Sequence, residues 1–181
     1  MPRSVLQGIF LLLAATVAQP ACAGPSGPAS QEIEQYIRSV RVPCYTKSGE
    51  GRCTIASIAD TSGIKVFYGR PSDGREFAVA FVDYQYDATG NAMDLMALVL
   101  RLEGGRWVPV GRADNIQGGS PRDVRFAPGR ITYVGTVVGP NDVRAAPKGR
   151  RAFTLLVDDG SVRFVRGAQG EAMSNRIQTG R

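Results

Sequence analysis

Short runs of alternating apolar and polar residues, separated by glycine-containing linkers, dominate the chain after Cys53. A period of two residues is typical of β-strands, and linkers such as Ser72-Asp73-Gly74 and Asp159-Gly160 suit hairpin turns, in which glycine adopts positive φ. Linkers this short cannot carry the long crossover that parallel neighbours need, so the strands should be antiparallel. The runs are Ile55–Ile58, Ile64–Tyr68, Glu76–Tyr86, Ala92–Leu102, Trp107–Arg112, Val124–Phe126, Ile131–Val138, Ala152–Val157 and Val162–Val165.

One helix should precede these strands. Apolar residues recur at helical spacing over 33–40, Ser30 suits the N-cap position, and Pro43 disfavours helical geometry at the residue before it. The sequence therefore predicts an α+β, mainly β fold. It combines one N-terminal helix with a curled antiparallel meander of about seven to nine strands, as a sandwich or a partly open barrel.

Two of the runs, Glu76–Tyr86 and Ala92–Leu102, are apolar on both faces. This pattern predicts central strands covered on both sides, by the helix on one side and by further strands on the other. Ala92–Leu102 also contains good helix formers, so a helix remains an alternative for this run.

The N-terminus resembles an export signal. Residues 9–18 form an apolar run too short to span a bilayer, and Ala21-Cys22-Ala23 matches a small-x-small cleavage site. We therefore expect a signal peptide over 1–23 and a periplasmic or secreted protein of a Gram-negative bacterium. A lipid anchor on Cys22 or a retained N-terminal anchor is the alternative. A spacer over 24–29, a single domain over 30–165 and a flexible tail over 166–181 complete the predicted organisation, with no transmembrane segment after cleavage.

Cys44 and Cys53 are the cysteines that remain after such cleavage. An exported pair this close in sequence is expected to form a disulfide. The Cys-x-x-Cys spacing of redox sites is absent, which argues against a reactive thiol pair.

The chain contains no histidine. This excludes Ser-His-Asp and Cys-His catalysis and histidine-ligated zinc. Because no serine lies in a motif that activates a nucleophile either, we predict no catalytic residue and favour a protein without enzymatic activity.

An acidic segment around residues 83–94 is the first candidate site. Oxygen ligands of Asp83, Asp87, Asn91 and Asp94 would bind Ca²⁺ if they converged. The spacing does not match an EF-hand loop, and a plain turn between two strands is the alternative. No other cofactor is expected.

A basic loop, Gly139–Arg151, is the second candidate. Arg144, Lys148, Arg150 and Arg151 would suit an anionic ligand or acidic partner. A solvated loop is the alternative, since the chain has 19 Arg against 3 Lys and arginine is common throughout. A nucleic acid is not expected, because aromatic residues are not interleaved with the basic ones.

Three aromatic residues, Tyr84, Tyr86 and Trp107, are the third candidate. Exposed aromatic side chains often anchor protein interfaces. In alternating strands they also pack in the core or at a sheet edge, and the sequence leaves both interpretations open.

Two stretches resemble a family of small exported proteins and lipoproteins of proteobacteria, largely uncharacterised. The shared features are turns: Gly90-Asn91, Gly104-Gly105 and Gly139-Pro140-Asn141-Asp142. The family then has a paired-cysteine-Pro element, where this chain keeps Pro147 but has Ala145 and Ala146. The resemblance implies export and a β-rich fold, and the missing cysteines argue against any cysteine-dependent role of this loop.

Three functions remain. The first is a non-enzymatic periplasmic binding module, such as an inhibitor or immunity-type partner of an envelope protein. The second is a basic envelope factor that associates with anionic lipid or polysaccharide, which a pI near 9.6 favours. The third is a carboxylate-based hydrolase of envelope glycans.

Overall fold

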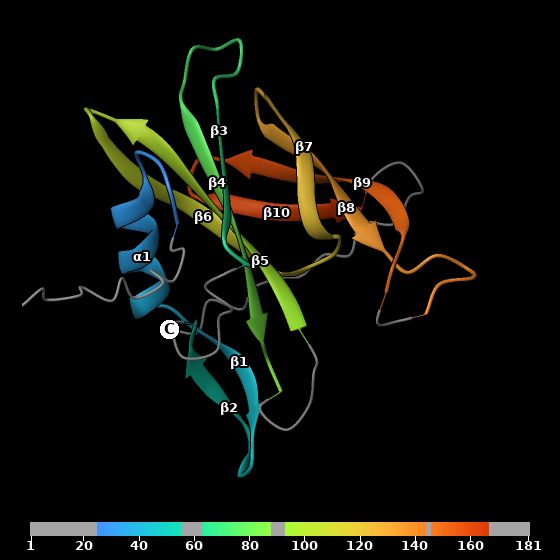
Figure 1. Cartoon of the computed structure of the whole chain (residues 1–181). Helices are drawn as coiled ribbons and strands as arrows, with labels where there is room; N and C mark the ends of the chain where they lie inside the picture. The colour runs from blue at the N-terminus through green and yellow to red at the C-terminus, as the bar shows by residue number, and fades with distance from the viewer. Residues whose placement is uncertain (1–24, 56–62, 88–92, 144–145, 167–181) are drawn as a thin grey trace, which may run out of the picture.

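The computed structural model describes residues 25–55, 63–87, 93–143 and 146–166. Within these ranges the chain forms one helix and antiparallel strands in three sheets, none of which closes into a barrel (Figure 1). The predicted α+β, mainly β class is therefore confirmed. The elements are α1 (Ser30–Ser39), β1 (Arg41–Thr46), β2 (Gly49–Thr54), β3 (Lys65–Gly69), β4 (Phe77–Gln85), β5 (Met93–Glu103), β6 (Arg106–Ile116), β7 (Gly119–Ala127), β8 (Arg130–Val137), β9 (Gly149–Asp158) and β10 (Ser161–Arg166).

Two four-stranded sheets form the body of the molecule. The first sheet has the order β3-β4-β5-β6 and the second the order β10-β9-β8-β7, so each is a meander of sequential strands. One apolar cluster joins them, because the inward side chains of β4 and β5 meet those of β8 and β9. Phe81 lies 4.8 Å from Tyr133 between ring centroids across this core. The two sheets thus form a sandwich.

The opposite face of the first sheet is also covered. Ile33 and Ile37 of α1, Val42 of β1 and Ile55 are buried against the even-numbered side chains of β4 and β5. The prediction that these two strands are central and covered on both faces is confirmed. The structure also decides between the alternatives for residues 92–102, since Met93–Glu103 is a strand.

Helix α1 begins one residue earlier than predicted. Ser30 is already helical, Ala29 holds the N-cap position, and no side chain caps the helix. The Ala29 carbonyl accepts the first helical hydrogen bond, from the Ile33 N–H at 3.0 Å. The N-cap prediction for Ser30 is therefore wrong. Ala29 is fully buried in the cluster beneath the helix, so packing rather than a polar cap sets this end.

Strands β1 and β2 form a hairpin at one end of the molecule (Figure 1). Cys44 and Cys53 form the predicted disulfide across it, with an S–S distance of 2.02 Å. The sequence did not predict these two strands. β2 is polar, rich in glycine and mostly exposed, so it lacks the apolar alternation that reveals a strand.

The chain passes from the first sheet to the second at Gln117 and Gly118. The Tyr133 hydroxyl, buried between the sheets, donates a hydrogen bond to the Gln117 carbonyl. Pairing irregularities flank this passage in β6 and β7. The non-glycine residues with positive φ in the described part of the chain lie in them: Asn115, Ser120 and Asp123. Such bulges bend a strand and increase its twist, which helps the chain change sheets.

Several predicted segments lie outside the described residues. They are the signal peptide over 1–23, residues 167–181 of the predicted tail and most of the run Ile55–Ile58. Arg166, predicted as the first residue of the tail, is the last residue of β10. Of the described helical segments, none has the length and apolar character needed to cross a bilayer.

Candidate functional site

The outer face of the second sheet carries five arginines. β8 presents Arg130 on this face, β9 presents Arg150, and β10 presents Arg163, while Arg122 and Arg125 extend from β7. Strand alternation explains the placement, because the neighbouring residues of each strand point into the core between the sheets. We call this surface the arginine face.

Small and β-branched residues separate the arginines. The register places Arg125 beside Thr132, Thr132 beside Thr154, and Thr136 beside Arg150. No described residue on this surface is buried, so no other described element covers it. The remaining residues of the face are Val134, Ala152, Leu156, Asp158, Ser161 and Val165.

Positive charge on the arginine face is little compensated. Among the described residues, only Arg163 of these five arginines has a carboxylate within ion-pair distance, at 3.5 Å from Asp158. The face therefore carries five positive charges and one negative charge. Guanidinium groups are weakly hydrated and bind phosphate and carboxylate oxygens in a fork, so this surface suits an anionic partner.

The described basic residues predicted to form one site in this loop lie on different surfaces. Arg150 lies on the arginine face, whereas its neighbour Arg151 points to the opposite side of β9. Lys148 is exposed just before β9, and Arg144 lies outside the described residues. The sequence missed the other four arginines of the face, although each falls at a polar position of its alternating strand.

Asp142 organises the loop between β8 and β9. One oxygen of its carboxylate, Oδ2, accepts hydrogen bonds from the backbone N–H groups of Gly139, Lys148 and Gly149 at 2.8, 2.7 and 3.0 Å. These bonds lower the pKa of Asp142. The Gly-Pro-Asn-Asp segment noted in the sequence is therefore a structural clasp at the base of this loop.

The candidate calcium ligands are separated by the sheet. Asp83 pairs with Leu95 and points toward the sandwich core, whereas Asp94 pairs with Tyr84 and points to the opposite face. Asn91 lies outside the described residues, and Asp87 follows β4. Within the ranges that the structure describes, no three acidic or cysteine side chains gather as a metal site would require.

The three aromatic candidates pack against other side chains and do not project into solvent. Tyr84 is 2% exposed beneath α1, and Trp107 packs edge-on against Tyr68 at 5.6 Å between ring centroids. Tyr86 is partly buried and contacts Tyr45. The packing interpretation, not that of exposed interface anchors, describes these three residues.

A polar cluster that the sequence did not reveal lies near Tyr84. Arg112 donates a hydrogen bond to Asp114 at 3.0 Å and another to the Arg41 carbonyl at 3.3 Å. Burial raises the pKa of Asp114 against the opposing effect of Arg112. Burial also raises the pKa of Asp94, which accepts a hydrogen bond from Tyr84 and is repelled by Asp114. The bulge at Asp114 and Asn115 produces this arrangement, and no sequence pattern marks it.

Comparison with known proteins finds no matching family model, no matching curated protein and no matching solved structure. The resemblance to small exported proteins of proteobacteria therefore stays a prediction.

Proposed function

We propose that this protein is a non-enzymatic binding module that acts outside the cytoplasm and associates with an anionic membrane surface through the arginine face. The observation that carries the proposal is the set of five arginines on one uncovered sheet face, of which one has a carboxylate partner among the described residues. The export signal predicted from the sequence of residues 1–23 supports this location.

The distribution of the charges suits a flat anionic surface. Arg125 lies on β7, Arg130 on β8, Arg150 on β9 and Arg163 on β10, so the charges span the full width of the sheet. Lipid headgroups of a bilayer form a two-dimensional array and can therefore reach all of these charges at once. No described aromatic side chain lies on this face, which argues against a protein interface centred on an aromatic anchor.

The expected affinity is modest. Each basic residue close to an anionic membrane contributes about 1 kcal/mol. Four uncompensated arginines then contribute about 4 kcal/mol, which corresponds to a dissociation constant of about 1 mM accessible lipid. Binding of this kind should weaken steeply as salt screens the charges.

Sedimentation with lipid vesicles tests the proposal. The full chain without its signal peptide should bind vesicles containing phosphatidylglycerol and leave neutral phosphatidylcholine vesicles unbound. The double variant Arg130→Gln/Arg150→Gln should bind about 25-fold more weakly, at about fivefold for each charge. The matched control, Arg38→Gln/Arg106→Gln, changes the net charge equally outside the arginine face. Equal losses in both variants, or binding that salt does not weaken, would contradict the proposal.

A protein partner is a second candidate, favoured by the hairpin of β1 and β2. The disulfide holds this hairpin, and Tyr45 is 48% exposed on it while it hydrogen-bonds Glu50 at 2.8 Å. A rigid projecting hairpin with an exposed aromatic side chain suits an inhibitor or immunity-type contact with an envelope protein. Crosslinking in the native compartment should then capture one protein with the wild type and lose it with Tyr45→Ala.

A further inference from the structure

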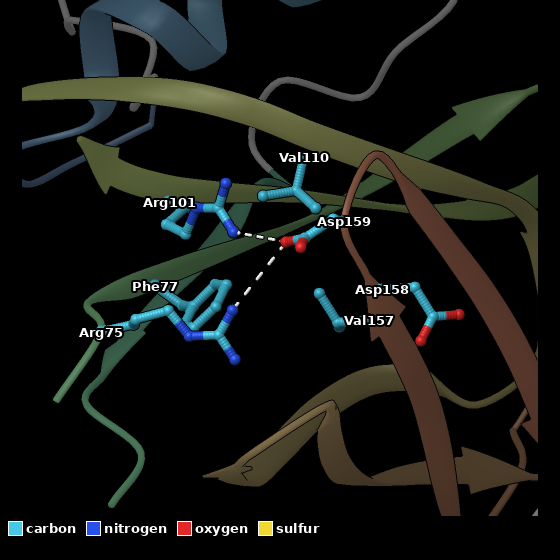
Figure 2. Close-up of a pocket in the computed structure, with 7 residues that line it drawn as sticks. All are labelled: Arg75, Phe77, Arg101, Val110, Val157, Asp158 and Asp159. Carbon is cyan, nitrogen blue, oxygen red and sulfur yellow. Dashed lines mark hydrogen bonds and ion pairs between the residues drawn. The ribbon is translucent and has the colours of Figure 1, made fainter. Parts of the chain in front are cut away.

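A hollow of about 220 Å³ lies between the two sheets at the turn that joins β9 to β10 (Figure 2). Its polar side is formed by Arg75, just before β4, by Arg101 of β5, and by Asp158 and Asp159 at the turn between β9 and β10. Its apolar side is formed by Phe77, Val110 and Val157.

Both arginines are held in place from one side. Arg75 donates from Nε and Nη2 to Asp73 at 2.9 and 2.6 Å, and the Arg75 guanidinium lies over the Phe77 ring at 5.5 Å. Arg101 donates from Nε to Glu103 at 2.6 Å, and its Nη2 contacts the same carboxylate. In each case a carboxylate two residues away in sequence orients the guanidinium through Nε and Nη2. The remaining nitrogen, Nη1, is left to contact another group.

The two Nη1 atoms are directed toward one position. In Figure 2 the dashed lines from Arg75 and Arg101 meet at the same Asp159 oxygen. Oδ1 of Asp159 accepts a hydrogen bond from Arg101 at 2.8 Å and lies 3.9 Å from Nη1 of Arg75. The hydrogen bond from Arg101 lowers the pKa of Asp159, so this carboxylate is held in its ionised form.

Asp159 is a weakly held occupant of this position. It lies on the tip of the turn between β9 and β10, and its side chain is 84% exposed. Ion pairs that are open to solvent contribute little, so a competing anion can displace this carboxylate at small cost. Arg101, by contrast, is 25% exposed, and Glu103 holds its Nε and Nη2 atoms.

We propose that this hollow binds a carboxylate that carries a small apolar group, such as the C-terminal residue of a peptide, and that Asp159 occupies the carboxylate position in the free protein. The ligand carboxylate would accept hydrogen bonds from Nη1 of Arg75 and Arg101, and its apolar group would contact Phe77, Val110 and Val157. The volume of the hollow suits a group of amino-acid size. The hollow shares only Asp158 with the arginine face, and ligand binding there does not depend on membrane binding.

Titration of the folded protein by isothermal calorimetry and by NMR tests the proposal, with N-acetylvaline as the probe and N-acetylvaline amide as its uncharged match. N-acetylvaline should bind with a dissociation constant on the order of millimolar, and the amide should not bind. Titration with inorganic phosphate, an anion without an apolar group, tests whether the hollow binds any anion equally well. Phosphate binding as tight as that of N-acetylvaline would show that the apolar lining contributes nothing and would overturn the assignment.

The Asp159→Ser variant distinguishes two interpretations of the hollow. It is either a ligand-binding site or only a structural ion pair between the sheets. Removal of the competing carboxylate should tighten N-acetylvaline binding about three- to fivefold. The matched control is Asp158→Ser, which removes the same charge from the same turn. In Figure 2 the Asp158 carboxylate points away from the two arginines. Its Oδ2 atom lies 3.5 Å from Nη2 of Arg163. An Asp159→Ser protein that binds no more tightly than Asp158→Ser would overturn the proposal.

Arg101→Gln should weaken N-acetylvaline binding at least about tenfold, because a hydrogen bond between charged groups is lost. The thermal unfolding midpoint is measured alongside. If Arg101→Gln unfolds, Arg75→Gln provides the same test at the more exposed arginine. Unchanged affinity in a folded variant of either arginine would contradict the proposal, whatever the vesicle experiment shows.

Discussion

The Asp142 carboxylate accepts hydrogen bonds from three backbone N–H groups at once. Its oxygen Oδ2 is shared by Gly139, Lys148 and Gly149. The donors come from both ends of the connection between β8 and β9, so one side chain closes the loop and fixes where β9 begins.

Asp142→Ala should release this loop and leave the sheets folded. The backbone hydrogen bonds lower the pKa of Asp142, so the folded protein favours the ionised carboxylate. Its stabilising effect is therefore present above the ordinary value of 3.8 and is lost as the pH falls through the lowered pKa. In wild-type NMR spectra the amide protons of Lys148 and Gly149 should titrate with a midpoint below 3.8. A midpoint at or above that value would contradict the assignment.

Asp94 is expected to have the opposite effect to Asp142 on how stability depends on pH. Burial raises its pKa, so the folded protein holds this proton more tightly than the unfolded chain does. The contribution of Asp94 to stability should therefore decrease as the pH rises from 3.8 through the raised pKa. Asp94→Asn, which keeps an acceptor for Tyr84, should reduce that decrease in urea unfolding measured over a pH series. The exposed Asp158→Asn is the control, and identical pH profiles for wild type and Asp94→Asn would disprove the interpretation.

The disulfide supports the half of the β1–β2 hairpin that packs little. β2 buries little, while Cys44 is 4% exposed and anchors β1. Ala substitution of both Cys44 and Cys53 should lower the free energy of unfolding by about 2–3 kcal/mol, because the unfolded chain regains the freedom of the closed loop. Urea unfolding with and without reductant measures this difference. A reductant that leaves wild-type stability unchanged would show that the link contributes nothing.

Strands with an apolar side chain at every second position were predictable, and strands with bulges were only partly so. Val124–Phe126 was the predicted part of β7, which in fact spans Gly119–Ala127. Its pairing shifts near the positive-φ residues Ser120 and Asp123 interrupt the period of two. The same effect shortened the predicted β6, whose bulge produces the Asp114 site. A bulge moves side chains to the other face, so simple alternation fails there.

The whole sandwich depends on close packing where the chain changes sheets. Gly118 has φ +93°, and a Cβ there would lie 2.4 Å from the Phe153 ring. Gly118→Ala should lower the free energy of unfolding by about 2–4 kcal/mol, from backbone strain together with overpacking. Its neighbour Gly119 has open space around it. Gly119→Ala should therefore change stability by less than about 0.5 kcal/mol in the same denaturant titration. Equal effects of the two substitutions would contradict this view of the junction.

Local alternation and turn chemistry made the antiparallel meander, the single helix and the two-sided burial of β4 and β5 predictable, because each depends on neighbours close in the chain. The arginine face, the paired arginines of the hollow and the cluster around Asp114 required the folded molecule. Arg75 and Asp159 are distant in sequence and meet because the two sheets pack face to face. Sheet register and strand order bring such residues together, and both arise from the packing of the core rather than from any local pattern.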